Sequence, residues 1–191
     1  KLGYILQEMK KILLTGAGGF IGYHFSNFLL KKGFKVYGVD NLNNSYDRRM
    51  KQWRISQLIK NKKFHFSKID ISSPLHLKKY FEKNFRLNKL DAIVNLAART
   101  GVRKSTLDPN SYYKSNVIGV LNLIQLANNY SIKNFIHAST SSVYGNNKNK
   151  NFSVGADTSK PLSNYAASKK ASEVLLYAYH ALQKQNITIL R

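Results

Sequence analysis

The sequence predicts an α/β fold in which helices cover both faces of a doubly wound parallel β-sheet. Short apolar or β-branched runs alternate with segments of helical periodicity along the chain. The chain has 191 residues, of which 43% are hydrophobic, enough for one domain with a buried core and too many for a disordered protein. Strands that alternate with helices require right-handed crossovers, which place successive strands parallel in one covered sheet.

Each expected element is a run of residues with one clear periodicity. The expected strands lie at 11–15, 35–40, 64–70, 92–96, 134–140 and 187–190. The expected helices lie at 20–32, 75–85, 112–129 and 165–185. Steps of three and four residues give the third helix one apolar face, formed by Val117, Val120, Leu121, Ile124 and Ala127. Polar loops at 41–47 and 146–158 are longer than connectors need, so we expect them to contact a ligand.

The charge balance is strongly basic, with 31 Lys and Arg against 9 Asp and Glu, a net charge of +22. By itself this favours an anionic partner such as a nucleic acid, a nucleotide or a membrane surface. The basic residues occur as short pairs such as Lys10 with Lys11, interleaved with Asn, and build no dense tract. We therefore interpret the charge as compositional drift, and nucleic-acid binding is not expected because no nucleic-acid motif accompanies it.

Several classes of protein are excluded. The sequence has no apolar window of about eighteen residues, the length that a membrane-spanning helix needs. It has no Cys, which removes disulfides, thiolate catalysis and zinc-thiolate sites, and no metal is expected. The lack of Cys also fits a reducing compartment, so we expect the protein in the cytoplasm.

The two ends of the sequence suggest a fragment. The chain starts at Lys1, whereas Met9 leads directly into an apolar run. We expect residues 1–8 to be an upstream extension and residues 9–191 to form the domain. Arg191 follows directly on the last expected strand, and few proteins end on a core strand, so we expect a C-terminal part to be missing.

A glycine-rich turn joins the first strand to the first helix. Gly16, Gly19 and Gly22 stand at steps of three, with Phe20 and Ile21 between the last two. The first glycine would allow a tight turn, the second would let the backbone approach a pyrophosphate, and the third would let the helix pack closely. The free N–H groups and positive dipole end of the helix would then face the phosphates.

A carboxylate stands at the end of the second strand. Asp40 falls eighteen residues beyond Gly22. There it could accept hydrogen bonds from the adenine-ribose hydroxyls and would repel a 2′-phosphate, which favours NAD over NADP. The alternative is a glycine turn with a capping Asp and no ligand.

A tyrosine and a lysine stand one helical turn apart. Tyr165 and Lys169 are four residues apart, so they project from one face of the last helix. A nearby ammonium stabilises a phenolate and lowers the tyrosine pKa from its ordinary value of about 10. Such a tyrosine can remove a proton from a sugar hydroxyl and return it. A hydroxyl-rich segment, 139–145, ends the preceding strand where doubly wound folds bind ligands. The alternative for Tyr165 is an ordinary surface residue.

In combination these motifs resemble the extended short-chain dehydrogenase/reductase family, whose fold is Rossmann-like, and in particular its NAD-dependent nucleotide-sugar epimerases and dehydratases. The resemblance covers essentially residues 9–191. It is carried by Gly16, Gly19 and Gly22, by Asp40 to Leu42, Asp70 and Ile71, Asn95 to Ala98 and Ser139 to Gly145, and by Tyr165 with Lys169. Asn95 stands where the family often has His, a change that we expect to be tolerated.

The resemblance implies NAD as the cofactor and assigns roles to residues. The implied cofactor-binding residues are Gly16, Gly19, Phe20, Ile21, Gly22, Asp40, Asn41, Asn44, Asp70, Ile71, Leu96, Ala97, Ala98, Asn116, Tyr165 and Lys169. Among them Asp70 and Ile71 would flank the adenine, and Asn116 would support the active site from its helix. Tyr165 would be the base and Lys169 would hold the nicotinamide ribose. The implied catalytic partners and substrate contacts are Thr140 at the reacting hydroxyl, Ser142 near the substrate, Ser141 and Arg103.

Two segments narrow the activity within the family. Dehydratases typically carry Asp and Glu directly after the Thr of this motif, whereas this chain has Ser141 and Ser142, which counts against dehydration. The stretch 97–103 resembles that of UDP-glucuronate 4-epimerases. Arg103 at its end would sit near a uronate carboxylate or a phosphate, or else be a solvated loop residue.

The resemblance therefore implies an NAD-dependent epimerase that inverts carbon 4 of a UDP-sugar, UDP-glucuronate or a similar one, through a transient 4-keto intermediate. The alternatives are a 4,6-dehydratase or reductase of the same family, and a non-enzymatic regulator that senses a dinucleotide. The sugar pocket of the family comes largely from a segment after the last strand seen here. The family also implies a homodimer through the helices at 112–129 and 165–185.

Overall fold

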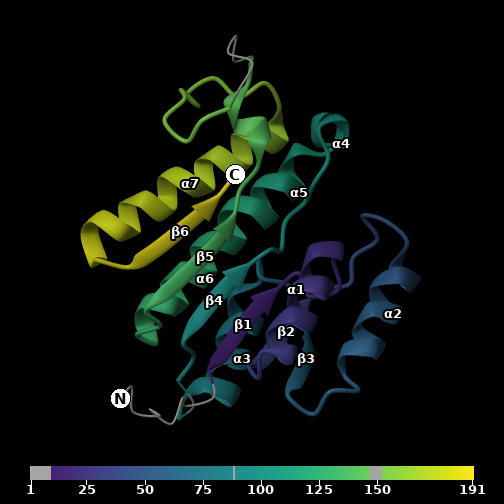
Figure 1. Cartoon of the computed structure of the whole chain (residues 1–191). Coiled ribbons are helices and arrows are strands. Elements are labelled where there is room, and N and C mark those ends of the chain that lie inside the picture. Colours follow the sequence, from purple (N-terminus) through teal and green to yellow (C-terminus); the bar gives the residue numbers. More distant parts are fainter. Residues whose placement is uncertain (1–9, 88, 147–151) are drawn as a thin grey trace, which may run out of the picture.

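A single parallel sheet organises the molecule, as the computed structural model shows (Figure 1). The structure describes residues 10–87, 89–146 and 152–191, so the expected upstream extension lies outside the described residues. The strands are β1 (Lys11–Thr15), β2 (Lys35–Asp40), β3 (Phe64–Lys68), β4 (Ala92–Asn95), β5 (Asn134–Ala138) and β6 (Asn186–Leu190). The predicted strands β3, β4 and β5 end one or two residues early, because their last residues leave the sheet to form loops at its carboxyl edge.

The strand order is β3-β2-β1-β4-β5-β6, and every neighbouring pair is parallel. This confirms the predicted doubly wound sheet. The chain runs outward from β1 to β3 and then returns across the middle to β4. The carboxyl ends of β1 and β4 are thus the point where the winding reverses, and in such sheets ligands bind outside that point.

Helices connect the strands and cover the sheet. They are α1 (Phe20–Lys31), α2 (Arg48–Leu58), α3 (Pro74–Phe85), α4 (Val102–Leu107), α5 (Pro109–Tyr113), α6 (Gly119–Asn129) and α7 (Asn164–Gln183), with a π-helical turn η1 (Lys114–Ile118) and a 3₁₀ turn η2 (Ser141–Tyr144). Helices α2 and α4 were not predicted. The sequence of α2 carries no apolar stripe, and two of its buried side chains are Lys51 and Arg54.

The predicted third helix is three successive elements, α5, η1 and α6. It begins at Pro109, earlier than expected, because the Asp108 carboxylate accepts a hydrogen bond from the Ser111 N–H and caps it. Val117 and Leu121, expected on the apolar face, are only half-buried. A π turn holds one more residue than an α turn, so residues on its two sides do not share one face. The buried apolar residues of α6 are instead Val120, Leu123, Ile124, Leu126 and Ala127.

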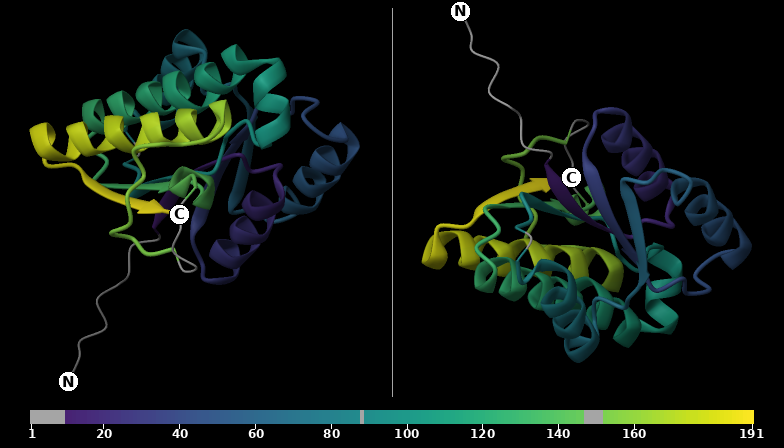
Figure 2. Two further views of the ribbon diagram at one scale, coloured as in Figure 1. Left: turned by 90° about the horizontal axis from the view of Figure 1, so that it is seen from above. Right: turned by 90° about the horizontal axis from the view of Figure 1, so that it is seen from below.

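Two apolar clusters lie on opposite faces of the sheet because side chains alternate along each strand. Leu13 and Ile93 belong to the larger cluster, under α3, α6 and α7. Leu14 and Val94 belong to the smaller one, under α1 and α2. Figure 2 shows the two groups of helices on the two sides of the sheet. Strands β1 and β4 are therefore packed between the two clusters.

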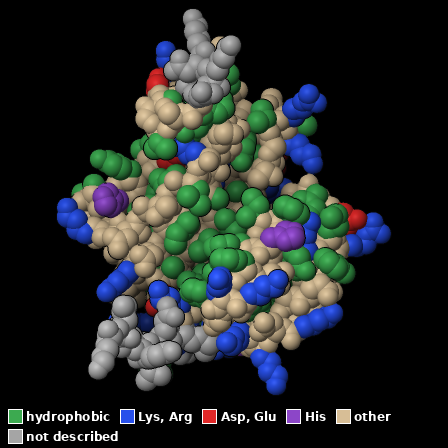
Figure 3. Space-filling model, viewed as in Figure 1, with side chains coloured by type: hydrophobic (Ala, Val, Ile, Leu, Met, Phe, Trp, Pro, Cys, Tyr) green, Lys and Arg blue, Asp and Glu red, His purple; other side chains and the backbone are tan. Residues whose placement is uncertain are grey.

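The surface carries the excess positive charge in a dispersed form. In the face shown in Figure 3, hydrophobic side chains gather in the middle and Lys and Arg side chains stand around the rim. No described helix combines the length and the apolar character that crossing a membrane requires. The edge strand β6 alternates exposed and half-buried residues, unlike the fully buried β4.

Candidate functional site

A pocket of about 500 Å³ opens at the carboxyl edge of the sheet, where β1, β2, β4 and β5 end. Its walls come from the glycine turn, the loop after β2 and helix α7. Among the sequence-predicted residues it is lined by Gly16, Gly19, Phe20, Ile21, Gly22, Asp40, Asn41, Asp70, Ile71, Leu96, Ala97, Ala98, Tyr165 and Lys169. The fold thus brings the glycine motif and the Tyr–Lys pair to one cavity.

The glycine turn leaves no room for side chains. Gly16 has a left-handed backbone with φ of +72°, and a Cβ added there would lie 2.9 Å from the Ala97 nitrogen. A Cβ on Gly22 would lie 2.1 Å from the Gly16 carbonyl oxygen. Gly19 donates its N–H to the same oxygen at 2.9 Å, which closes the turn. Close packing of backbone on backbone therefore requires glycine at these positions.

Helix α1 presents its N-terminus to the pocket. Its N-cap residue, Gly19, supplies no side-chain cap, and Phe20 and Ile21 of the first turn line the cavity with side chains that are 66% and 64% exposed. The first turn of a helix carries N–H groups without intrahelical acceptors and the positive end of the dipole. This wall of the pocket is therefore suited to an anionic group.

Asp40 ties the glycine turn to the end of β2. Its carboxylate is buried and accepts hydrogen bonds from the Gly18 N–H at 3.1 Å and the Leu42 N–H at 2.8 Å. It still lines the pocket, and a carboxylate has further lone pairs to offer a hydroxyl.

Asp70, after β3, forms the neighbouring wall. It accepts a hydrogen bond from Asn41 at 3.0 Å and two from Ser72. Burial raises the pKa of Asp70, but the hydrogen bonds from Ser72 and Asn41 and the charge of Lys114 outweigh it, so the net pKa lies below the ordinary value. Asp70 therefore carries its negative charge at neutral pH.

Sequence reasoning missed a cationic wall from α2. Lys51 and Arg54 line the pocket and are 5% and 8% exposed. Arg54 donates to the Gly18 carbonyl at 3.2 Å and to the Tyr46 hydroxyl at 2.8 Å, and Lys51 donates to the Asn43 side chain at 2.8 Å. Burial lowers the pKa of Lys51, against the raising effect of Asp40. The sequence feature that could have indicated this wall is the three-residue spacing of Lys51 and Arg54 shortly after the polar loop at 41–47.

Helix α7 positions Tyr165 and Lys169 one turn apart. The Ser163 side chain caps its N-terminus by accepting from the Ala166 N–H at 3.1 Å. The half-buried Tyr165 ring packs edge-on against Tyr112, with centroids 6.2 Å apart. Lys169 is 1% exposed, and its Nζ lies 3.1 Å from His137 Nε2.

The charge of Lys169 differs from the sequence-based expectation of a simple ammonium. Burial lowers the pKa of Lys169 to about 7, although the Glu173 carboxylate opposes this. At neutral pH the side chain is therefore close to the midpoint of its titration.

The hydroxyl-rich segment divides at the end of β5. Ser139 lines the pocket, whereas Thr140, Ser141 and Ser142 do not. Thr140 Oγ1 accepts from the Ser142 N–H at 3.1 Å and so caps η2, which carries the next residues away from the cavity. Ser139 was therefore not among the predicted site residues, although the predicted hydroxyl-rich segment contains it.

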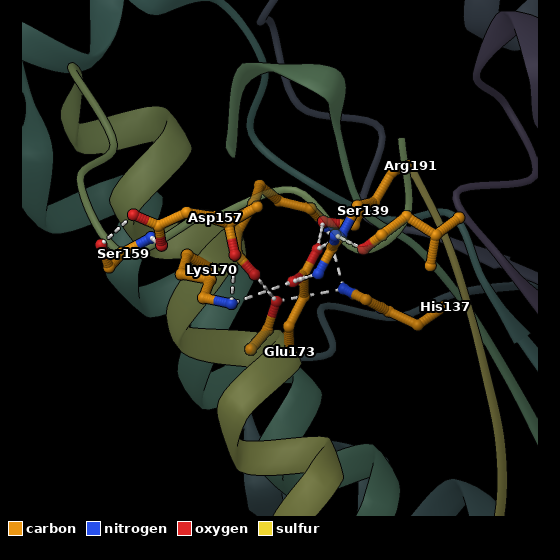
Figure 4. Close-up of polar contacts among 11 residues, drawn as sticks. His137, Ser139, Asp157, Ser159, Lys170, Glu173 and Arg191 are labelled. Atoms are coloured by element: carbon orange, nitrogen blue, oxygen red, sulfur yellow. Dashed lines mark hydrogen bonds and ion pairs between the residues drawn. The ribbon is translucent and has the colours of Figure 1, made fainter. Parts of the chain in front are cut away.

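Ser139 is held by an ionic cluster around the buried Glu173 of α7 (Figure 4). Its hydroxyl donates to Glu173 Oε1 at 2.5 Å, and Arg191 donates to the two Glu173 oxygens at 3.1 and 2.9 Å. Burial raises the pKa of Glu173, but the hydrogen bonds from Arg191 and Ser139 and the charges of Arg191 and Lys170 outweigh it and leave the net pKa below the ordinary value. The cluster joins the ends of β5 and β6 to the middle of α7.

Asn116 supports the loop after β4 without lining the pocket. It is fully buried in η1, accepts from the Arg99 N–H at 2.8 Å, and donates to the Arg99 carbonyl at 3.0 Å and to Ser168 Oγ at 2.9 Å. Asn44 and Arg103 are exposed and do not line the cavity.

Within the described ranges there is no group of three or more acidic, His or Cys side chains placed to hold a metal ion.

Comparisons with known proteins agree with this geometry. The family model described as GDP-mannose 4,6 dehydratase matches residues 13–191. The UDP-glucuronate 4-epimerase of Thermodesulfobacterium geofontis is 43% identical over 179 residues, which are 94% of this chain and 54% of that protein. The chain spans about half the length of the curated relatives it matches.

Two solved structures share the fold. The UDP-glucuronic acid 4-epimerase of Bacillus cereus, in complex with UDP-glucuronic acid and NAD, is 35% identical with a TM-score of 0.85, over 95% of this chain and 55% of that one. A dTDP-glucose 4,6-dehydratase of Streptomyces venezuelae, with NAD bound, is 28% identical with a TM-score of 0.81, over 93% and 54% of the two chains.

Proposed function

Because the chain belongs to the GDP-mannose 4,6 dehydratase family of extended short-chain dehydrogenases/reductases, we propose that it binds NAD and carries the catalytic residues of a UDP-sugar 4-epimerase. One observation carries the proposal. The glycine turn and the Tyr165–Lys169 pair, more than 140 residues apart in the sequence, line the same pocket at the point where the winding of the sheet reverses.

The pocket fits a dinucleotide. The crowded backbone at Gly16 and Gly22 and the uncapped N-terminus of α1 form a cradle for a pyrophosphate. Asp40 offers acceptors to ribose hydroxyls and repels a 2′-phosphate, which supports NAD over NADP. Lys51 and Arg54 add positive charge on the same side. When bound, NAD would take up and return the hydride of carbon 4.

Residues of α7 would transfer the proton of the sugar hydroxyl. Tyr165 would accept the proton of the sugar 4-hydroxyl and later return it. Lys169, one turn further along, would hold the nicotinamide ribose and, when protonated, stabilise the tyrosine phenolate. Ser139, held by Glu173, is a further hydroxyl at this end of the pocket. Thr140 and Ser142, which do not line the pocket, remain proposed substrate contacts.

A uronate is the proposed sugar. The support is the 43% identity to a UDP-glucuronate 4-epimerase and the stretch from Ala97 to Arg103. Arg103, exposed at the start of α4, is free to meet a carboxylate or phosphate. A 4,6-dehydratase is the second candidate, favoured by the dehydratase neighbour of 28% identity, but Ser141 and Ser142 lack the acid and base that elimination needs.

We also propose a homodimer through α5, η1, α6 and α7. Apolar side chains on these helices are exposed, among them Tyr113, Ile118, Val174 and Tyr177. Pairing with the same helices of a second copy would bury them in a four-helix bundle. The proposed location in the cytoplasm rests on the absence of Cys from the sequence.

The experiment supplies NAD with UDP-glucuronate or UDP-glucose and looks for each 4-epimer by chromatography. The protein is assayed as the 191-residue chain and as the same chain extended by the C-terminal part of the Thermodesulfobacterium relative. We expect the 4-epimer of UDP-glucuronate mainly from the extended form, and weak NAD binding by the short one. A 4-keto-6-deoxy product would support the dehydratase instead.

The matched variant is Tyr165→Phe, which removes the hydroxyl and keeps the ring against Tyr112. We expect epimerisation to fall by at least about 100-fold, the usual contribution of a general base, while NAD affinity stays within about twofold. Epimerisation retained by this variant would remove Tyr165 from the role of base.

A further inference from the structure

Two buried cations of α2 line the pocket without an acidic partner. Lys51 and Arg54 are 5% and 8% exposed, yet neither forms an ion pair within the described part of the chain. Burial lowers the pKa of Lys51 and the charge of Asp40 opposes this, but the Asp40 oxygens already accept from the Gly18 and Leu42 N–H groups. A buried charge is costly unless it is paired. The two cations therefore favour a bound anion as their counter-charge.

Arg54 reaches from α2 to the back of the glycine turn. Its Nη1 atom carries two hydrogens and donates to the Gly18 carbonyl at 3.2 Å and to the Tyr46 hydroxyl oxygen at 2.8 Å. The Tyr46 hydroxyl in turn donates to the same carbonyl at 3.3 Å. The direction of all three bonds is fixed, because a guanidinium only donates and a carbonyl oxygen only accepts. The Gly18 carbonyl thus receives two hydrogen bonds, one of them from a charged donor.

Aromatic rings hold the guanidinium at this position. The Cζ atom of Arg54 lies 5.8 Å from the centre of the Phe20 ring and 5.7 Å from the centre of the Tyr46 ring. Both distances are in the range of cation–π contacts. Burial raises the pKa of Tyr46 against the lowering effect of Arg54, so the hydroxyl keeps the hydrogen that it donates. Arg54 therefore connects the loop after β2, the glycine turn and the first residue of α1.

The carbonyl that Arg54 binds belongs to the peptide group between Gly18 and Gly19. Neither glycine has a Cβ, so little steric hindrance opposes the rotation of this peptide group. Its N–H, that of Gly19, donates to the Gly16 carbonyl oxygen at 2.9 Å and closes the turn. In a trans peptide the N–H and the C=O point in opposite directions. Rotation would therefore turn the Gly18 oxygen against the Gly16 oxygen and open the turn.

We propose that Arg54 is a positioning residue for the pyrophosphate cradle. It fixes the peptide group between Gly18 and Gly19 by its carbonyl, and it places an unpaired buried charge behind the turn that only a ligand with a diphosphate group neutralises. The identity of that ligand, NAD, rests on the proposed function. The fixed orientation of the peptide group does not, because it needs no ligand.

The first test needs no ligand and follows amide hydrogen exchange by NMR in the 191-residue chain. Arg54→Gln removes the charge and shortens the side chain. We expect the Gly19 N–H to exchange at least about tenfold faster than in the original chain, the effect of losing about one net hydrogen bond. The N–H of the fully buried Leu14 in β1 should keep its rate and so show that the sheet is intact. Unchanged exchange at Gly19, or equal acceleration at Leu14, would overturn the proposal.

Two further variants separate the parts of the contact. Tyr46→Phe keeps the ring beside Arg54 and removes one of the two bonds to the Gly18 carbonyl. We expect a smaller acceleration at Gly19, about threefold, because the charged donor remains. Arg49→Gln is the matched control, since Arg49 stands on the same helix, is exposed and pairs with Asp47. It should leave the Gly19 exchange rate unchanged, and an acceleration equal to that of Arg54→Gln would refer the effect to the charge of α2 as a whole.

The second test compares three ligands by NMR titration of the same chain. NAD and ADP-ribose contain the pyrophosphate, whereas adenosine contains neither the pyrophosphate nor the nicotinamide. Arg54→Gln should weaken NAD and ADP-ribose by about tenfold and adenosine by less than about twofold. Arg54→Lys, which keeps the charge and a donor, should recover most of the lost affinity. An equal loss for all three ligands would make Arg54 a general packing residue and overturn its role at the cradle.

The two proposals fail separately. If exchange at Gly19 accelerates as expected and the original chain binds neither NAD nor ADP-ribose, the proposed function is wrong and Arg54 still fixes the peptide group. If the original chain binds NAD and Arg54→Gln changes neither the Gly19 exchange rate nor the preference for ligands with a pyrophosphate, the proposed function stands and the role of Arg54 is wrong.

Discussion

The two ends of the pocket are built from different parts of the chain. At the glycine turn the shape is set by the main chain, with Gly16, Gly22 and Ala97 in backbone contact over an apolar cluster. At the α7 end the shape is set by buried polar side chains, among them Asn116, Lys169 and Glu173. The first end depends on the absence of side chains, whereas the second depends on which side chain donates to which.

This difference bears on how each end responds to its surroundings. The glycine turn is anchored by the side chains of Asp40 and Arg54, which both bond to Gly18, and is closed by a hydrogen bond between backbone groups. The α7 end concentrates groups whose pKa values are shifted by burial and by one another, namely His137, Lys169 and Glu173. The glycine end should therefore be sensitive to volume, and the α7 end to pH and to hydrogen-bond partners.

The largest effect should come from adding one methyl group to the glycine end. Gly22→Ala would place a Cβ 2.1 Å from the Gly16 oxygen, so the helix or the turn must move. We expect a loss of about 3 kcal/mol in the free energy of unfolding, measured by urea denaturation, and loss of NAD binding. Gly155→Ala is the matched control, since nothing lies within 4 Å of its added Cβ. Equal stability of the two variants would contradict a backbone-built cradle.

Removal of the Asn116 side-chain amide should lower the stability of the protein nearly as much. Asn116→Ala deletes three hydrogen bonds and leaves the Arg99 N–H without its side-chain acceptor. We expect unfolding to become easier by about 2–3 kcal/mol, by the same denaturation measurement. Asn128→Ala, an exposed residue on the continuing helix α6, should cost less than about 0.5 kcal/mol. A small cost at Asn116 would mean that this end is not held by its side chains.

The Glu173 cluster should make stability depend on pH. The folded-state pKa of Glu173 lies below its ordinary value, so its contribution is present above that ordinary value and is lost as the pH falls through the folded-state pKa. Glu173→Gln should cost about 2 kcal/mol at pH 7 and flatten the decline in stability below about pH 4.5. Denaturation curves from pH 3 to 7 measure both. If the stability of the variant declines below about pH 4.5 as that of the original chain does, other carboxylates cause the decline.

The smallest effect is expected at a buried hydroxyl of α1, the helix that follows the glycine turn. Ser26 of α1 is fully buried, and its Oγ has no hydrogen-bond partner among the described residues. Ser26→Ala should therefore leave stability unchanged or raise it by up to about 1 kcal/mol in the thermal unfolding curve. Destabilisation by more than this would show that polar side chains matter at both ends, and the contrast between them would weaken.

Local patterns in the sequence predicted the strands, the parallel sheet and the glycine turn, whereas most of the candidate pocket residues were implied by the resemblance to the family. Apolar runs mark the strands, and three glycines mark the turn without reference to any distant residue. Helix α2 was missed because two of its four buried residues, Lys51 and Arg54, are cationic and interrupt the apolar period to which Ile55 and Leu58 belong. Burial of charge next to Asp40 depends on the loop that folds back over the glycine turn, and no local pattern contains that information.

By itself, the sequence determined where the chain turns, which segments become strands and which residues could carry chemistry. Only the tertiary structure decided the charge of those residues and the groups that they contact. Lys169 is identified as a candidate by its spacing from Tyr165, but its pKa of about 7 follows from burial under β5. His137, Asn95 and Thr15 are distant in the sequence and meet only because parallel strands align them. Direct contact and the exclusion of water are properties of the fold, and they set the protonation of each buried group.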